Sequence, residues 1–523
     1  MRNPSPSVKL ARVAAFSLLA ACAAQAELKL PALFGDHMVL QSGQPVACWG
    51  WANPGEKIRV AFTDPAGKQL AQAQAVAANG EGRWSLQLPP LPQGSVGKLT
   101  IQTDHGETKT IDDVLPGEVW LASGQSNMTR KVGTADFPKE VAVLARTEAA
   151  EARGSIRFFT VVQGGADAPR NETPGKWVVV TPETVVNCSA VAWNFAAKLN
   201  RDLKAPVGII LSGYGGTPVE SWVPEEALDA TLASMPVWKR HANLLASYPE
   251  AKAKYDQTFA AWEATNPTPE LQKQNAETKP RAPYCETDSR APVRLFNGMI
   301  YGLAPYTLQG VLWYQGEENS SRSQEYGELI QALIKSWRGF WGTELPFYYV
   351  ELANTHKPQQ KPSEDGWGFI REAQQAALKL PKTAVATAVD LGNGEIHPWN
   401  KKPVGERLAA IALSDVYGKA IPSRSPQFTS FEIQGSVIRV KFDHAEGLRA
   451  RGDGSVAGFA ITGNGTDWKW ADAKIVGESV EVSSKEIPSP TAVRYGWASN
   501  PVLSLENQYG LPLRPFRTDS IPR

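Results

Sequence analysis

The sequence is poor in cysteine, in excess charge of either sign and in long apolar runs. Only 4 of its 523 residues are cysteine, and they are widely scattered, which argues against a disulfide scaffold and against a cysteine metal cluster. The 54 basic and 53 acidic side chains leave a net charge of +1, so attraction to nucleic acid or to an anionic membrane is not expected. Beyond the N-terminus no segment reaches about 18 consecutive apolar residues, and a membrane span is therefore not expected.

The first 26 residues have the pattern of an export signal. Basic residues at positions 2, 9 and 12 precede a short apolar run, and the small-residue sequence AQA follows it at 24–26. This arrangement predicts a signal peptide over residues 1–26 and a protein that is exported to the periplasm or secreted. The sequence LAAC at 19–22 leaves another interpretation open, in which Cys22 carries a lipid and the protein is an outer-membrane lipoprotein.

The chain is longer than most chains that fold around a single hydrophobic core, so more than one domain is expected. Its sequence pattern also changes along its length. Residues 27–112 consist of short alternating strands separated by glycine and proline, which predicts an N-terminal β-sandwich domain. A similar pattern over 421–500 predicts a second β-rich module. Residues 501–523 are expected to form a tail that returns to the central domain.

Between residues 113 and 420, apolar strands alternate with helical segments. The strand-like runs lie at 118–123, 206–212, 310–316, 346–352 and 383–390. This alternation predicts an α/β domain with a parallel sheet and flanking helices. A polar stretch rich in Ala, Lys and Glu interrupts the pattern and predicts a helical insert at about 224–292, over the edge or mouth of the sheet.

A serine stands just after the first of these strand-like runs, in the sequence GEVWLASGQSNMTRKV at 117–132. The apolar run stops at Gly124 and presents Ser126 in a tight turn, at the end of the sheet where ligands bind and backbone N–H groups can stabilise an oxyanion. The motif GQSNM resembles the nucleophile block of the SGNH hydrolases. The longer motif GEVWLASGQSNM resembles their sialate O-acetylesterase-like branch, the carbohydrate acetylesterases that include xyloglucan acetylesterases. The resemblance implies a flavodoxin-like SGNH hydrolase domain with accessory β-sandwich modules, and Ser126 as the nucleophile.

Two further loops are expected at the same edge of the sheet. Glycines at 215 and 216 allow the backbone to approach the serine closely, and the resemblance implies an oxyanion donor here, Gly215 ahead of Gly216, beside the N–H of Ser126. At the end of the run at 310–316, Gln315 is the expected side-chain donor, because its amide can donate a hydrogen bond where an ionised carboxylate cannot. Glu317 is expected to support the histidine or to bind a sugar hydroxyl.

His397 is the expected general base for Ser126. It precedes a helical segment in the motif IHPWNK, whereas the other five histidines lie in β-rich regions, in the insert or in a loop without a motif. The SGNH pattern has an aspartate three residues before the base, and that position is a glycine here. Glu395 is the leading candidate for the acid because it is local, with Glu317 and Asp390 as alternatives. A Ser-His dyad with weak acid support also stays open.

These blocks predict a serine carbohydrate O-acetylesterase that needs no metal and no organic cofactor. The near-zero charge, the export signal and the 17 tryptophans favour an acetylated plant cell-wall polysaccharide such as xyloglucan as the substrate. A sialate 9-O-acetylesterase is the alternative. A non-catalytic carbohydrate-binding protein and an esterase for long acyl chains are the rival classes. The sequence does not predict an oligomeric state.

Overall fold

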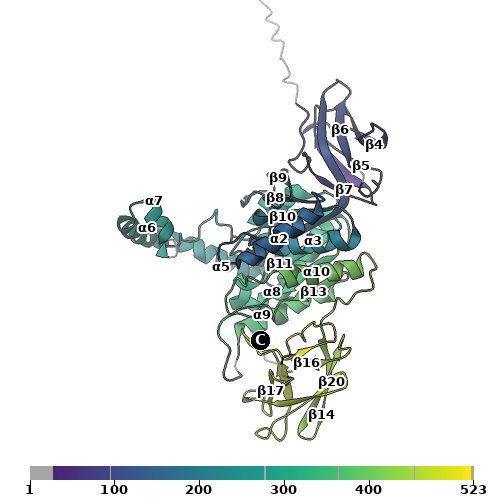
Figure 1. Cartoon of the computed structure of the whole chain (residues 1–523). Helices are drawn as coiled ribbons and strands as arrows, with labels where there is room; N and C mark the ends of the chain where they lie inside the picture. Colours follow the sequence, from purple (N-terminus) through teal and green to yellow (C-terminus); the bar gives the residue numbers. More distant parts are fainter. Residues whose placement is uncertain (1–26, 95, 276–277, 363, 453, 520–523) are drawn as a thin grey trace, which may run out of the picture.

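The computed structural model describes residues 27–94, 96–275, 278–362, 364–452 and 454–519. The expected signal peptide and Cys22 lie outside the described residues. Three regions follow one another in space as they do in sequence: an N-terminal β-domain, a central α/β domain and a C-terminal β-module (Figure 1). In the described part of the chain, no helix combines the length and the apolar character that a membrane crossing requires.

The central domain is built on a parallel sheet. Its strands, in order across the sheet, are β13 (Thr383–Thr387), β12 (Phe347–Glu351), β11 (Gly310–Tyr314), β7 (Thr108–Gly124), β10 (Val207–Gly213), β8 (Ile156–Val161) and β9 (Gly175–Val179). All neighbours are parallel except β8 and β9. The strand that comes first in sequence, β7, lies at the centre, where the strand order reverses and open α/β sheets bind their ligands. The predicted α/β fold class is confirmed.

Two tryptophans show that helices cover both faces of this sheet. Trp120 of β7 packs against Phe195 of α3 (Ala190–Leu203). Trp313 of β11 pairs with Ser123 in the register, so it points to the opposite face, where it packs against Trp337 of α8 (Ser323–Trp341). The other helices and helical turns of the domain are α1 (Ser126–Thr129), α2 (Lys139–Ala152), α9 (Gly366–Gln374), α10 (Lys402–Asp415), η1 (Val185–Asn187), η2 (Val219–Trp222), η4 (Phe296–Ile300), η5 (Tyr301–Leu303), η6 (Glu317–Arg322) and η7 (Gln375–Lys379).

The N-terminal β-domain shares a strand and a core with the α/β domain. Its own strands are β1 (Val39–Gln41), β2 (Val46–Trp51), β3 (Lys57–Thr63), β4 (Gln69–Val76), β5 (Arg83–Leu88) and β6 (Gly97–Thr103). Strand β6 pairs with the first half of β7, and β10 and β11 pair with its second half. The boundary expected at residue 112 therefore lies inside one continuous strand. One cluster of buried apolar side chains contains both Trp49 from this domain and Trp120 from the central sheet.

The C-terminal β-module has an apolar core of its own, which includes Ile438, Val480 and Phe516. Its strands are β14 (Gln427–Gln434), β15 (Val437–Asp443), β16 (Arg449–Ala450), β17 (Phe459–Thr462), β18 (Trp468–Trp470), β19 (Asp472–Val476), β20 (Ser479–Ser483), β21 (Ala492–Tyr495), β22 (Leu505–Glu506) and β23 (Phe516–Arg517). The tail residues expected to return to the central domain supply β22 and β23, which pair with β16 and β21 of the module.

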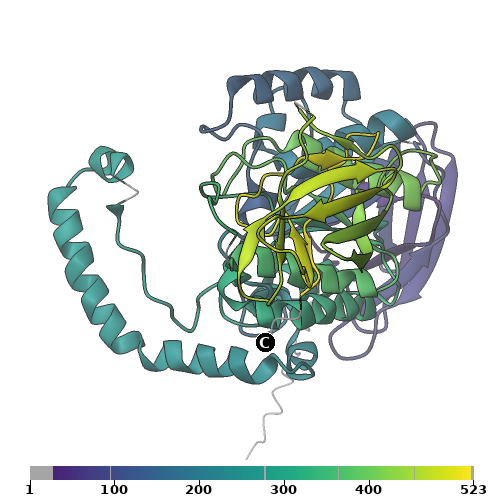
Figure 2. The ribbon, with the colours of Figure 1, turned by 90° about the horizontal axis from the view of Figure 1, so that it is seen from below.

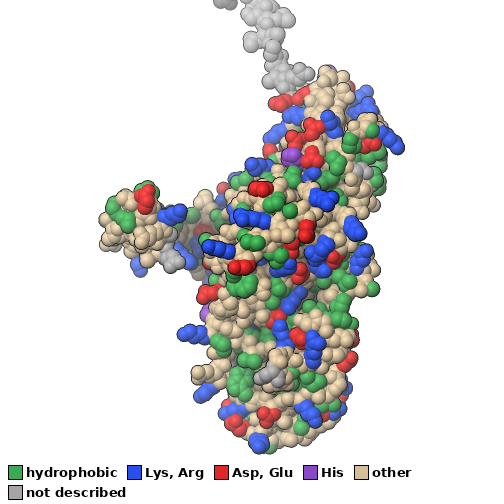
Figure 3. All heavy atoms as spheres, in the orientation of Figure 1, with side chains coloured by type: hydrophobic (Ala, Val, Ile, Leu, Met, Phe, Trp, Pro, Cys, Tyr) green, Lys and Arg blue, Asp and Glu red, His purple; other side chains and the backbone are tan. Residues whose placement is uncertain are grey.

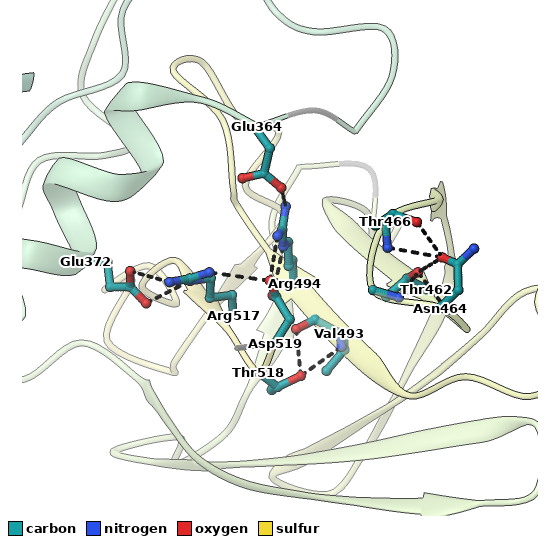
Figure 4. A network of polar contacts seen from close by, with 11 residues as sticks. Glu364, Glu372, Thr462, Asn464, Thr466, Val493, Arg494, Arg517, Thr518 and Asp519 are labelled. Atoms are coloured by element: carbon teal, nitrogen blue, oxygen red, sulfur yellow. Dashed lines mark hydrogen bonds and ion pairs between the residues drawn. The ribbon is translucent and has the colours of Figure 1, made fainter. Parts of the chain in front are cut away.

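Ion pairs join this module to the α/β domain. Arg517 contacts Glu372 at 2.8 Å, and Arg494 contacts Glu364 at 2.8 Å (Figure 4). The tail also supplies Arg514, which lies 2.9 Å from the fully buried Glu351 at the end of β12. The tail residues thus complete the module and contact the central domain.

The insert forms an arm that leaves the body of the molecule (Figures 1 and 2). Its helices are α4 (Glu225–Asp229), α5 (Ser234–Ala246), α6 (Tyr248–Thr265) and α7 (Pro269–Gln274). Helix α6 buries only Trp262, and the space-filling view shows α6 and α7 standing apart from the rest of the protein (Figure 3). Helix α5 forms the root of the arm, and residues 278–292 bring the chain back to the sheet.

Candidate active site

Strand β7 ends in a turn that requires glycine. Gly124 has φ 134°, and a Cβ atom there would lie 2.1 Å from the carbonyl oxygen of Tyr314. Glycine therefore lets the end of β7 lie against β11, where the N–H of Gln125 donates to the same carbonyl at 3.0 Å. Helix α1 begins at the next residue, so Ser126 stands at the carboxyl edge of the sheet.

His397 faces this serine from the loop between β13 and α10. Its Nε2 lies 2.9 Å from the Oγ of Ser126. Both residues are half-buried, at the edge where the loops after β7, β10 and β11 meet. The distance is that of a hydrogen bond and is short enough for direct proton transfer.

An arginine occupies the other ring nitrogen of the histidine. Nη2 of Arg130 lies 2.9 Å from Nδ1 of His397. A guanidinium can only donate, so Nδ1 accepts and the proton of the neutral ring is on Nε2, toward the serine. Nη1 of Arg130 lies 3.1 Å from each carboxylate oxygen of Asp136. We call His397, Arg130 and Asp136 the histidine cluster.

The environment of His397 strongly favours the neutral ring. Burial is the main cause, with the positive charges of Arg130 and Lys401 next, and Asp136 opposes them. Together they lower the pKa of His397 to about 4. The imidazole is therefore uncharged at any pH well above 4, as a general base requires.

The carboxylates expected beside the histidine lie elsewhere. Glu395 is exposed, and among the described residues the ring nitrogens of His397 have Ser126 and Arg130 as their hydrogen-bond partners. Asp390 is buried and pairs with Arg407 at 2.7 Å. The structure therefore brings neither carboxylate to the ring, and Asp136 contacts it only through Arg130.

Glu317 belongs to a second group, in which Asn127 is central. Nδ2 of Asn127 donates to Oε1 of Glu317 at 2.5 Å, and Nζ of Lys401 donates to Oδ1 of Asn127 at 2.5 Å. Nδ2 also donates to the carbonyl of Ile396, the residue before the histidine, at 3.0 Å. We call Asn127, Glu317 and Lys401 the asparagine cluster. It connects the serine turn to the loop that carries His397.

The asparagine cluster is almost completely buried. The exposed fractions are 2% for Asn127, 2% for Lys401 and 7% for Glu317. Burial raises the pKa of the Glu317 carboxyl and lowers the pKa of the Lys401 ammonium to about 7. Glu317 therefore does not lie where a sugar hydroxyl could reach it from solvent.

The glycine turn after β10 lies against the serine. A Cβ atom built on Gly215 would be 3.4 Å from the Cβ of Ser126. In the described part of the chain, the N–H groups of Ser126 and Gly215 have no hydrogen-bond acceptor. Two backbone donors are thus available beside the hydroxyl, where an oxyanion would form. Gly216 follows with φ 69° and is exposed.

The amide of Gln315, the expected side-chain donor, is already engaged. Its Nε2 donates to the carbonyl of Thr217 at 3.2 Å and to Oδ1 of Asn319 at 2.8 Å, which uses both hydrogens. Asn319 is itself oriented by the N–H of Val219 and the carboxylate of Glu220. Gln315 therefore supports the glycine turn from behind.

Within the described residues, one group of three side chains has the spacing of metal ligands: Glu56, Asp104 and His105. It lies in the N-terminal β-domain, away from the serine. Nδ1 of His105 is 3.2 Å from a carboxylate oxygen of each acid, and its contact with Glu56 is a hydrogen bond. The described residues around Ser126 include no comparable set.

Comparison with known proteins agrees with this geometry. Residues 291–414 match the sequence family described as carbohydrate esterase, sialic acid-specific acetylesterase. The chain is also similar to a carbohydrate acetylesterase from Xanthomonas citri of known crystal structure. The identity is 31%, the TM-score is 0.77, and the match covers 94% of this chain and 100% of that one. The chain belongs to the carbohydrate acetylesterases. It is therefore a carboxylic ester hydrolase, and the resemblance predicted from the sequence is confirmed.

Mammalian relatives of this acetylesterase extend the match. The human sialate O-acetylesterase is 29% identical over 447 residues, which cover 79% of this chain and 76% of the human protein. The mouse sialate O-acetylesterase is 26% identical over 511 residues, with 89% and 88% covered.

Four polar residues around the serine of the acetylesterase were not predicted: Arg130, Asp136, Asn127 and Lys401. Asn127 and Arg130 lie in the serine motif, and Lys401 lies in the histidine motif. Their positions within these two motifs are the feature of the sequence that could have identified them as site residues. Asp136 stands in a polar loop whose sequence gives no such signal.

Proposed function

We propose that the acetylesterase removes O-acetyl groups from a glycan through an acetyl-serine intermediate on Ser126. The observation that carries this proposal is the 2.9 Å distance between Oγ of Ser126 and Nε2 of His397. Oγ attacks the acetyl carbonyl carbon while its proton passes to Nε2. The ester C–O bond then breaks, and His397 returns the proton to the departing sugar oxygen. Water, deprotonated by the same nitrogen, then attacks the acetyl carbon. The bond from that carbon to Oγ breaks, the proton returns to Oγ, and acetate leaves.

The N–H groups of Ser126 and Gly215 are the proposed oxyanion donors, with Gly216 as the alternative on the same turn. Each donor in such a site lowers the barrier by about 3 kcal/mol. Gln315 is left out because its amide hydrogens are bound to Thr217 and Asn319. Its proposed role is to hold the turn that presents Gly215.

The position of Arg130 sets a condition for the first step. Nε2 can accept the serine proton only when the ring proton is on Nδ1, and Nδ1 cannot carry a proton while Arg130 donates to it. We infer that Arg130 moves away from Nδ1 before attack and remains bound to Asp136. Asp136 then supports the histidine indirectly, because it holds Arg130.

The proposed substrate is an acetylated neutral polysaccharide of the plant cell wall, such as xyloglucan. A sugar carboxylate would call for an uncommitted arginine, and those near the sheet's edge have partners. Arg322 pairs with Glu220, Arg407 pairs with Asp390, and Arg130 pairs with Asp136. Arg371 is buried and donates to backbone carbonyls. The sialate alternative is favoured by the names of the mammalian relatives.

Acetate release from two substrates tests the proposal. Wild-type protein is expected to deacetylate xyloglucan faster than 9-O-acetylated sialate, and Ser126→Ala is expected to lose kcat by a factor on the order of 10⁶. Activity on sialate alone would contradict the proposed substrate. A Ser126→Ala variant with near-normal activity would contradict the proposed mechanism. Glycan binding without release of acetate from any ester would favour the non-catalytic alternative.

We also propose that the enzyme acts outside the cytoplasm. The support is the signal pattern over residues 1–26, which would bring the enzyme to polysaccharides that are too large to enter the cell. Sequencing of the exported protein tests this, since cleavage after Ala26 leaves Glu27 first and lipidation leaves Cys22 first.

A further inference from the structure

A small hollow lies between the insert and the loop that follows β11. Its volume is about 130 Å³. The residues that line it and matter here are Pro218, His241, Leu244, Tyr284, Glu318 and Arg322. They come from the turn after β10, from α5 at the root of the arm, from the returning segment 278–292 and from η6. The insert thus forms the outer wall, and the α/β domain forms the inner wall.

This hollow is next to the serine site along two separate loops. Pro218 stands three residues after Gly215, which lies against Ser126. Glu318 follows Glu317 of the asparagine cluster, and its N–H lies 3.4 Å from Oε1 of Gln125, the residue before the serine. The turn after β10 and the loop after β11 thus each connect the serine site to the hollow.

The acidic side chains around the hollow slightly outnumber the arginines. Arg240 binds Glu220 and Glu325, each at 3.0 Å. Arg290 binds Asp288 at 2.6 Å, and Arg322 lies 3.3 Å from Glu220. Glu318 adds a carboxylate that lies within the field of Arg281, and Glu286 acts on His241, so four arginines face five acidic side chains. A carboxylate on the ligand would find no surplus positive charge to pair with, so its burial would cost free energy. A neutral ligand avoids this cost.

Several polar groups in the hollow still lack a partner. Nε of Arg322 is buried with no hydrogen-bond acceptor among the described residues. The side chain of Glu318 is half-buried, and within the same residues no donor binds its carboxylate. Nδ1 of His241 is bound to the hydroxyl of Tyr284 at 2.6 Å, which leaves its Nε2 available. Burial lowers the pKa of His241, which favours the uncharged ring.

We propose that this hollow is a subsite for a neutral sugar residue adjacent to the acetylated one. Glu318 accepts from a sugar hydroxyl, and His241 Nε2 adds a second polar contact. Leu244 and Pro218 contact the apolar edges of the ring, in keeping with the mixed walls of small-molecule sites. The role of the insert is then to complete the substrate site. This inference rests on the proposed function of Ser126.

Two substrates of different size separate the subsite from the chemistry. A small aryl acetate, 4-nitrophenyl acetate, reaches only the acetyl position, whereas an acetylated xyloglucan oligosaccharide reaches the hollow as well. For Glu318→Ala and for His241→Leu we expect the ratio of kcat/KM for the oligosaccharide to kcat/KM for the aryl acetate to fall at least tenfold. The matched control is Glu446→Ala, which removes the same side chain from a different hollow, beside the C-terminal β-module. It should leave the ratio unchanged.

Direct binding keeps the subsite testable if the proposed chemistry fails. Calorimetric titration of the deacetylated oligosaccharide into Ser126→Ala should give a dissociation constant that rises at least tenfold when Glu318→Ala is added. An unchanged ratio together with unchanged binding would overturn the proposal, as would an equal loss on both substrates. Tighter binding of free sialate than of the neutral oligosaccharide would overturn the neutral-sugar assignment. An inactive wild-type protein that still loses binding in Glu318→Ala would overturn only the proposed function.

Discussion

The two polar clusters beside Ser126 differ in exposure and in the way they are connected. In the histidine cluster the exposed side-chain fractions are 28% for Arg130 and 59% for Asp136, so this ion pair is screened by water and can rearrange at small cost. The asparagine cluster is buried, and its hydrogen bonds reach both the serine turn and the histidine loop. In the proposed mechanism, the cluster that must rearrange during the reaction is open to solvent, whereas the cluster that connects the serine turn to the histidine loop is fixed in the interior.

The strongest test of this contrast is Asn127→Ala. The change removes the donor to Ile396 and leaves the buried Glu317 and Lys401 without the amide between them. We expect kcat on 4-nitrophenyl acetate to fall about 10²-fold to 10³-fold because the histidine is displaced, with a loss of about 3 kcal/mol in the free energy of unfolding. Steady-state kinetics and urea unfolding measure the two effects.

Asn266→Ala is the matched control for that variant. Asn266 is also buried and its amide also donates to a backbone carbonyl, that of Trp262, but it lies in the arm. It should lower stability without a comparable loss of kcat. If both variants lost kcat equally, the asparagine cluster would have no special role in alignment.

The histidine cluster is tested by Arg130→Met. Without the guanidinium the pKa of His397 should rise from about 4 toward its ordinary value of 6.5, and a general base is active only above its pKa. Because burial, the main cause of the low pKa, remains in the variant, we expect the acid limb of the kcat/KM profile to move up by about one pH unit, part of the way to the ordinary value. An acid limb that stayed in place in the pH profile would show that Arg130 does not act on the ring. Arg146→Met, on the exposed side of α2, is the control.

Lys401→Met tests the asparagine cluster through the pH dependence of the free energy of unfolding. The folded protein holds the pKa of Lys401 at about 7, below its ordinary value of 10.5, so between these values the unfolded chain binds more protons than the folded one. The free energy of unfolding from this group should therefore rise with pH between about 7 and 10.5. The variant should lose that rise, and kcat should fall about fivefold because Asn127 loses a donor.

Urea unfolding at pH 7 and at pH 9.5 gives the measurement for Lys401→Met. Lys402→Met removes the neighbouring lysine, which pairs with Glu148 outside the cluster, and serves as the control. An identical pH dependence in Lys401→Met and wild type would contradict the proposed proton difference.

The smallest effect is expected for Glu395→Gln. The side chain is exposed and has no contact with the histidine ring among the described residues, so kcat/KM should change less than twofold. Asp136→Asn, which weakens the partner of Arg130, should have a larger effect on the pH profile. A tenfold loss in Glu395→Gln, with little change in Asp136→Asn, would make Glu395 the supporting acid and would exchange the two roles.

The fold of the α/β domain could be predicted because its signals are local. Apolar runs followed by helical segments mark the strands of a parallel sheet, and the tight turn at Gly124 is visible in the sequence itself. The continuity of β7 into the N-terminal β-domain was harder to predict, because Pro116 and Gly117 inside the strand are typical of a domain boundary.

In the site, the sequence motifs predicted that Ser126 and His397 lie together. They did not predict which group contacts the second ring nitrogen. Glu395 was favoured for its distance along the chain, whereas the fold directs Arg130 from the serine motif to that position. Gln315 was assigned by residue type alone, and its amide is held by Asn319, whose own orientation depends on contacts far along the chain. Such competition between hydrogen-bond partners depends on three-dimensional packing, which residue spacing does not encode.

Strand β7 runs without interruption through 17 residues, from the N-terminal β-domain to the turn before Ser126. The ladder that it forms with β6 has an irregularity between Ile111 and Val114, where Asp113 has φ 53°. The apolar core that contains both Trp49 and Trp120 nevertheless joins the N-terminal β-domain to the sheet and opposes its movement over the serine as a cover. Movements that close around a long polymer chain are then expected from loops and from the helical arm. The N-terminal β-domain acts as an extension of the sheet itself.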